Sequence, residues 1–190
     1  MPDEKVIIEP SIIPIRLAAL EIAKGKLGMQ EDKGPDGKGL NTGEIVDWSC
    51  DGFTRQRGLS WCAFFACQCF RAAIRERGDV QQLAHWMKLA NGGCDLLWKR
   101  LSGEGWTWPW AENGRLPEPG DMLFYIHLNK DTGERRFHGD STPDLRHVSL
   151  ITKFAPPSVH DLSGNHGNQV GPHKEPIKSK SLYGVARIPF

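Results

Sequence analysis

The sequence lacks the features that mark several classes of protein. No apolar run approaches the roughly 20 residues that a membrane-spanning helix needs, so we expect no membrane span. The stretch 1–17, MPDEKVIIEPSIIPIRL, has no basic start, no uninterrupted apolar core and no small-residue cleavage site, so we expect no signal peptide. The 24 basic and 23 acidic side chains leave a formal net charge of +1. Because proteins that bind nucleic acid usually carry a clear basic excess, we expect no nucleic-acid partner.

Cysteine is present, but in a number that argues against a disulfide framework. The chain has five cysteines and no secretory signal, which indicates reduced thiols in a cytosol-like compartment. The 39% hydrophobic and 25% charged content is typical of a globular protein, and 190 residues suffice for one sizeable core. We therefore expect a single domain over residues 1–190, with residues 1–11 as a flexible N-terminal arm.

The order of the predicted elements indicates an α+β fold. Helical periodicity with start and stop signals is found in four segments, 12–27, 60–78, 79–91 and 94–101. Short β-branched or aromatic runs between turn residues predict four strands, 121–128, 146–154, 158–163 and 182–190. Helices therefore precede an antiparallel sheet, which is the order of α+β proteins.

Three segments outside these elements have no regular pattern. The tract 102–120 is rich in Gly, Trp, Pro and Asn and should be irregular. The insertion 129–145 is longer than a tight hairpin needs. The loop 29–43 is polar and glycine-rich, and its acidic residues admit a calcium site, but the order of ligands in an EF-hand is absent. We favour a solvated loop there.

Three of the cysteines lie in one stretch, GLSWCAFFACQCF, at residues 58–70. Cys67 and Cys69 are about 200° apart around an α-helix, so they cannot both face one metal ion. Neighbours on one helix also lack the geometry of a disulfide. Because free Cys is among the most buried residue types, we predict that Cys67 and Cys69 pack in the core and that the chain binds no metal there.

Cys62 differs because of its place in the predicted helix. With Ser60 as the N-cap, Cys62 falls in the first turn, where unpaired backbone N–H groups and the helix dipole favour an anion. That position lowers the pKa of a thiol and so favours the thiolate, which is the nucleophilic form. A thiolate nucleophile needs a histidine base and a third group that orients the ring.

The partners of Cys62 must come from the predicted sheet. His147, in RHVSLITKF, is our first choice for the base because a strand would hold it in one orientation, although a lone strand histidine is more often structural. His127, at the end of the preceding strand, is our second choice. Asn165, in SVHDLSGNHGN, follows the next strand and supplies a polar third group.

Tryptophan is abundant, with seven residues in the chain. Two interpretations remain open. The rings anchor the core and the loops, or some of them line a substrate groove, where flat rings stack on sugar or peptide faces. The candidates for a groove are Trp61, Trp106, Trp108 and Trp110.

Six segments in chain order resemble one group of enzymes. They are GMQEDKGPDGKG, LSWCAFF at a helix start, PEPGDMLFY, RHVSLIT, SGNHGNQV and the closing YGVARIP. Together they resemble the CHAP and NlpC/P60 amidase-peptidases, which are papain-like cysteine hydrolases of the bacterial cell wall. The resemblance is to phage-type CHAP domains and covers roughly residues 15–190. It implies a papain-like fold, with N-terminal helices packed on a C-terminal antiparallel sheet.

The resemblance also implies a catalytic set. Carried over, the nucleophile is Cys62, the base is His147 and the third residue is Asn165. Related sequences often read Glu-Gly-Asn at the third motif, whereas this chain has Ser163-Gly164-Asn165, and Asn168 in a second Gly-Asn pair competes for the role. The backbone N–H of Cys62 would stabilise the oxyanion, and residues 47–54 are candidates for a second donor.

The function implied is hydrolysis of amide bonds in bacterial peptidoglycan. The enzyme would be an endopeptidase or an N-acetylmuramoyl-L-alanine amidase, working through a thiolate and an acyl-enzyme without cofactor or metal. Made in the cytoplasm, it would reach the wall after lysis, by phage delivery or by signal-independent export. Two alternatives remain. They are a hydrolase of the same fold acting on another amide or a thioester, and a wall-binding module without activity.

Overall fold

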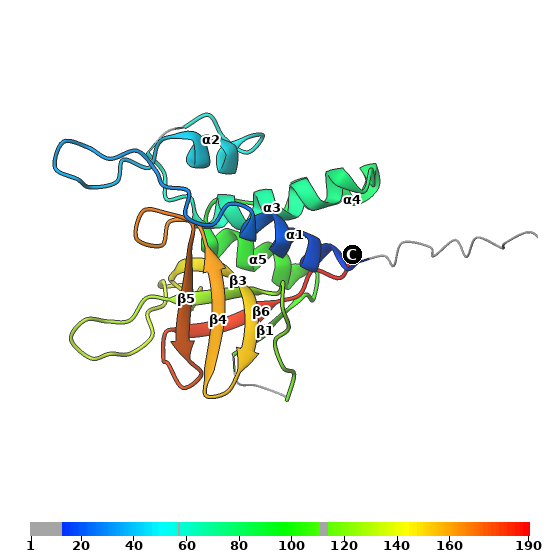
Figure 1. Cartoon of the computed structure of the whole chain (residues 1–190). Helices are drawn as coiled ribbons and strands as arrows, with labels where there is room; N and C mark the ends of the chain where they lie inside the picture. Colours follow the sequence, from blue (N-terminus) through cyan, green and yellow to red (C-terminus); the bar gives the residue numbers. More distant parts are fainter. Residues whose placement is uncertain (1–12, 57, 111–113) are drawn as a thin grey trace, which may run out of the picture.

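A computed structural model of the chain describes residues 13–56, 58–110 and 114–190. The expected arm, residues 1–11, lies outside the described residues. Within the described part, a layer of helices packs on one side of a sheet (Figure 1). The helices are α1 (Ile15–Lys24), α2 (Glu44–Cys50), α3 (Cys62–Glu76), α4 (Val80–Leu89) and α5 (Cys94–Gly103). The strands are β1 (Thr107–Pro109), β2 (Met122–Ile126), β3 (Leu145–Ala155), β4 (Ser158–Ser163), β5 (Gly171–Pro176) and β6 (Leu182–Ala186).

The sheet has six strands in the order β1-β6-β2-β3-β4-β5, and neighbouring strands run antiparallel. The predicted α+β class, with helices before an antiparallel sheet, is therefore confirmed. No helix in the described ranges is long and apolar enough to cross a membrane.

Three elements were not predicted, and each is short or atypical in composition. α2 has only seven residues and follows Gly43, whose φ of 107° suits glycine. β1 has three residues at one edge of the sheet. β5, with the sequence GPHKEP, forms the other edge, which is where a strand tolerates proline.

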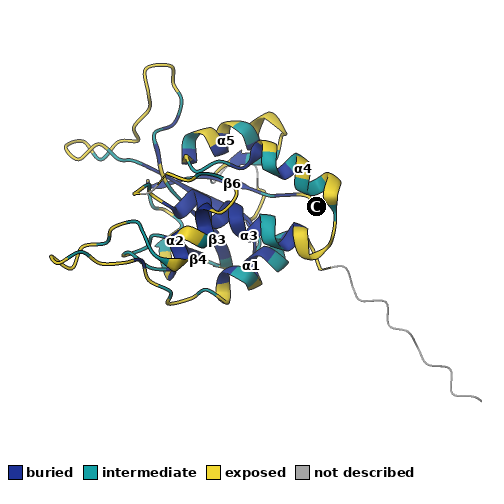
Figure 2. Cartoon of the chain, turned by 90° about the horizontal axis from the view of Figure 1, so that it is seen from above, coloured by how far each residue is buried: buried dark blue, intermediate teal, exposed yellow. Residues whose placement is uncertain are grey.

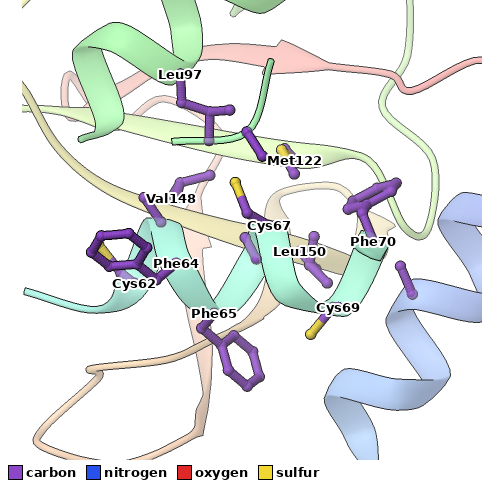
Figure 3. Close-up of a cluster of buried hydrophobic side chains, with 14 of the residues drawn as sticks. Cys62, Phe64, Phe65, Cys67, Cys69, Phe70, Leu97, Met122, Val148 and Leu150 are labelled. Atoms are coloured by element: carbon purple, nitrogen blue, oxygen red, sulfur yellow. The ribbon is translucent and has the colours of Figure 1, made fainter. Parts of the chain in front are cut away.

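α3 is the central helix of the core. Eleven of its residues are buried, and the helix lies in the middle of the helical layer, where it packs against α1, α2 and α4 and against β3 of the sheet (Figure 2). Figure 3 shows the sulfurs of Cys67 and Cys69 on opposite sides of α3, and both side chains are fully buried. Burial raises the pKa of Cys67 to about 12 and raises that of Cys69 as well. The prediction that these two cysteines are packing residues is confirmed.

Two long loops project from the same side of the molecule (Figures 1 and 2). The loop 29–43 is anchored by Glu31, which is only 4% exposed. The insertion 129–145 is anchored on the start of α5, where Asp95 Oδ1 accepts from the Leu145 N–H at 2.6 Å and Asp95 Oδ2 lies 3.2 Å from His138 Nε2. Both loops therefore have fixed attachments to the rest of the domain.

Candidate active site

Cys62 is the first residue of α3, as the sequence predicts for a helix start. The N-cap position is occupied by Trp61 and no side chain caps the first turn, so the assignment of Ser60 as N-cap is wrong. The N–H groups of the first turn have no partner within a helix. They are therefore available to stabilise negative charge at the helix start.

The residue before Cys62 is held on both sides. The Trp61 ring is fully buried and its Nε1 donates to Glu31 Oε2 at 2.7 Å. The backbone at Gly164 packs against the Trp61 ring so closely that an added Cβ would lie 2.5 Å from Trp61 Cζ3. A glycine is required for this close approach. The start of α3 is thereby fixed relative to the end of β4.

The Cys62 sulfur lies in a group of polar atoms. Its Sγ is 3.8 Å from Cys94 Sγ and 3.9 Å from Ser60 Oγ. The pKa of Cys62 lies well below the ordinary thiol value, first because Cys94 hydrogen-bonds to it. A hydrogen bond from His147, the charge of His147 and the backbone of Val148 act in the same direction, and burial opposes them. Within the pair, these contacts favour the thiolate at Cys62, while the pKa of Cys94 is raised above the ordinary value, first by its hydrogen bond to Cys62.

His147 is the histidine that the fold brings to this thiolate. It lies in β3, opposite Tyr125 in β2, and the two rings are 5.8 Å apart. Its Nε2 is buried and has no hydrogen-bond partner among the described residues. His127 instead lies 3.9 Å from Asp144 through its Nε2 and is about half exposed. Of the two predicted bases, the structure places His147 beside Cys62.

Asn165 is connected to the surroundings of Cys62 through Ser60. Its backbone has a φ of 58°, and its Nδ2 donates to Ser60 Oγ at 3.2 Å and to Asn41 Oδ1 at 3.4 Å. Ser60 is thus the link between Asn165 and Cys62. No hydrogen bond between Asn165 and His147 is found among the described contacts, so a role in orienting the ring stays a prediction.

Asn168, the competing candidate, has a different task. With its amide oriented to satisfy both neighbours, its nitrogen donates to Glu31 Oε1 at 3.2 Å and its oxygen accepts from the Gly39 N–H at 3.2 Å. These bonds hold the loop 29–43 against the turn after β4. Between the two asparagines, only Asn165 reaches the surroundings of Cys62 through a described hydrogen bond.

A polar cluster on the outer face of the sheet adjoins His147, and sequence reasoning missed it. Tyr125, which faces His147, donates to Asp161 Oδ2 at 2.5 Å, and His173 Nδ1 lies 3.3 Å from the same oxygen. The hydrogen bond to Asp161 raises the pKa of His173. Asp161 Oδ1 and the Ser149 hydroxyl are buried without partners among the described residues. The only signal in the sequence was an aspartate in the predicted strand SVHDLS.

A cavity of about 520 Å³ has Ser60, the neighbour of the Cys62 sulfur, in its wall. It is lined by residues 53–54, 59–60, 64 and 90–93, so Ser60 and the approach to Cys94 form part of its wall. Gly92 is required there because an added Cβ would lie 1.9 Å from Phe64 Cζ. A larger cavity of about 870 Å³, lined by residues 46–47 and 50–56, contains none of the groups around Cys62.

The predicted tryptophan groove is not assembled beside Cys62. Trp61 is fully buried and offers no surface to a substrate. Trp106 packs edge-on against Phe190, with ring centres 5.3 Å apart. Trp108 and Trp110 line a separate cavity of about 220 Å³ that includes Phe154.

That separate cavity is remote from the nucleophile. Phe154 and His147 lie seven positions apart on β3, which corresponds to about 23 Å along a strand. Packing therefore accounts for Trp61 and Trp106, and a substrate-binding role of Trp108 and Trp110 stays a prediction.

Comparisons with known protein families, with curated proteins and with solved structures find no match to this chain. The described residues also contain no group of three or more His, Cys, Asp or Glu side chains arranged to hold a metal ion. In the loop 29–43, the oxygens of Glu31 and Asp32 accept hydrogen bonds from Trp61 and Thr42. The assignment of the candidate active site therefore depends on the contacts around Cys62 described above.

Proposed function

We propose that the chain is a cysteine hydrolase in which Cys62 is the nucleophile and His147 is the general base and acid. The observation that carries the proposal is the placement of a thiol of lowered pKa at the first residue of α3, with His147 among the causes of that lowering. A thiolate at a helix start beside a histidine is the arrangement of activated cysteine nucleophiles.

The reaction that this geometry supports is acyl transfer. The Cys62 thiolate attacks an amide carbonyl, and N–H groups of the first turn of α3 stabilise the oxyanion. His147 protonates the leaving amine, and a water molecule then hydrolyses the thioester of the acyl-enzyme. The amide of Asn165 and the hydroxyl of Ser60 hydrogen-bond to each other at 3.2 Å, and both are polar groups that can bind the substrate beside the sulfur.

We further propose that the substrate is bacterial peptidoglycan, cleaved at an amide bond of its peptide stem or cross-bridge. Support comes from the order of the motifs, which resembles CHAP and NlpC/P60 enzymes, and from the α+β arrangement with helices before an antiparallel sheet. The cavity of about 520 Å³ beside Ser60 has the size of a site for a short peptide.

Digestion of purified peptidoglycan, followed by mass spectrometry of the products, tests this proposal. New N-termini on stem peptides identify an endopeptidase, and free lactyl-ended sugars identify an amidase. A folded protein whose Cys62 alkylates rapidly at neutral pH but leaves peptidoglycan intact would refute the substrate and retain the nucleophile. In that case the remaining proposal is a hydrolase of another amide or a thioester.

A further inference from the structure

Cys94 is a second thiol at the site, and it forms or breaks no bond in the proposed hydrolysis. It is the first residue of α5, as Cys62 is the first residue of α3. The two residues are 32 positions apart in the sequence, yet their sulfurs lie 3.8 Å apart. Both side chains are buried, with 2% of Cys62 and 8% of Cys94 exposed. Two helix starts therefore place two sulfurs against each other.

The two sulfurs lie near enough to form a disulfide after a small shift. An S–S bond measures about 2.05 Å, so the sulfurs must approach each other by roughly 1.8 Å. Each cysteine stands at the end of its helix, and Cys94 follows Gly92 and Gly93, which have the freedom to absorb such a shift. Cys67 and Cys69 offer no such approach to each other, because they face opposite sides of α3 (Figure 3).

The pKa values of the two thiols are shifted in opposite directions, and the lowered pKa of Cys62 favours its oxidation. Hydrogen bonds from Cys94, His147 and the backbone of Val148 favour the thiolate of Cys62. A thiolate is the form that a peroxide oxidises to a sulfenic acid. The Cys94 sulfur lies 3.8 Å from that of Cys62, within reach of a sulfenic sulfur formed there, so Cys94 has the position of a resolving cysteine.

We propose that Cys62 and Cys94 are a site of reversible oxidative modification, in which a peroxide joins the two sulfurs as a disulfide. The Cys62 thiolate attacks the O–O bond, taking one oxygen and releasing water after proton transfer. The Cys94 sulfur then attacks the sulfenic sulfur, and a second water leaves. Two thiols are thus oxidised by two electrons and one peroxide is reduced to two waters. A dithiol reverses the reaction by thiol–disulfide exchange.

The modification has a consequence that rests on the proposed function. A sulfur that is bonded to Cys94 is not a nucleophile, so the oxidised protein loses turnover and regains it after reduction. Oxidation would also protect Cys62, because a disulfide prevents further conversion to the sulfinic acid, which is not reduced by thiols.

The test is a disulfide map of the oxidised full-length chain. The reduced protein is treated with hydrogen peroxide, its free thiols are alkylated, and peptides are analysed without reduction. We expect a cross-linked peptide pair containing Cys62 and Cys94, the loss of these two thiols from the alkylated set, and full recovery after dithiothreitol. Cys69→Ala, on the other side of α3, is the matched control and should cross-link as the wild type does.

Two further variants keep the result interpretable. In Cys94→Ser and Cys94→Ala no cross-link can form, so Cys62 should proceed to the sulfinic acid and gain the mass of two oxygen atoms. If Cys62 of the folded wild-type protein reaches the sulfinic acid without cross-linking, or pairs with another cysteine, the proposal is overturned. The map uses no substrate, so its outcome is independent of whether peptidoglycan is cleaved.

Discussion

Replacing Cys94 by Ala should raise the pKa of the Cys62 thiol. The Cys94 sulfur lies 3.8 Å from that of Cys62, and its hydrogen bond is the largest cause of the lowered pKa. A hydrogen bond to a charged group contributes about 1.5–3 kcal/mol, and S–H is a weak donor, so we take the lower limit. Removing this donor destabilises the thiolate relative to the thiol, so the pKa of Cys62 rises.

The assay is the pH dependence of alkylation by iodoacetamide, with peptide mass spectrometry to score Cys62 alone. The midpoint should move to higher pH in Cys94→Ala and move less in Cys94→Ser, whose hydroxyl can still donate. Cys69→Ala should leave the midpoint unchanged, because that residue is fully buried on the other side of α3. An unchanged midpoint in Cys94→Ala, or an equal shift in both Cys94 variants, would refute the hydrogen bond as the cause.

Two further predictions concern the support of the site. Gly164→Ala should lower the free energy of unfolding by about 1–3 kcal/mol, measured by urea denaturation, because the added Cβ overpacks against the buried Trp61 ring. Gly103→Ala is the control and should not destabilise the protein, because its Cβ meets nothing within 4 Å. Equal stability of the two variants would contradict this reasoning. Asp161→Asn should lower the NMR-titrated pKa of His173 toward 6.5. Since the folded pKa of His173 is raised, its pairing with Asp161 stabilises the folded protein below about pH 6.5. In the wild type this stabilisation should be lost as the pH rises through the folded pKa, and in the variant it should be absent at every pH. A His173 titration that Asp161→Asn leaves unchanged would count against the pairing.

The local features of the nucleophile could be predicted from the sequence. A serine, an aromatic residue and Cys62 precede a long amphipathic run that ends near Gly78, which was enough to predict α3 and a thiol at its start. The alternation in RHVSLITKF was enough to place His147 on a strand. These signals are local, because they depend only on neighbours along the chain.

What the sequence did not reveal depends on contacts between distant segments. Cys94 approaches Cys62 only because α5 begins where the chain passes Phe64 at Gly92, and no spacing in the sequence encodes that meeting. Asp161 joins Tyr125 through the register of β2, β3 and β4.

The tryptophans are a second case in which the sequence did not reveal how distant segments meet. Their abundance was visible in the sequence, but their distribution over separate parts of the fold was not, because it follows from which face of each element is buried.

The most direct test of the central claim compares the wild-type chain with Cys62→Ala on purified peptidoglycan. We expect the wild type to release fragments with new amide-derived ends, and Cys62→Ala to release none while keeping its thermal unfolding transition. Cys69→Ala is the matched control, since it removes a buried sulfur on the other side of α3 and leaves the proposed nucleophile and its neighbours in place, and it should retain turnover. Persistent cleavage by folded Cys62→Ala would contradict the assignment of Cys62 as the nucleophile.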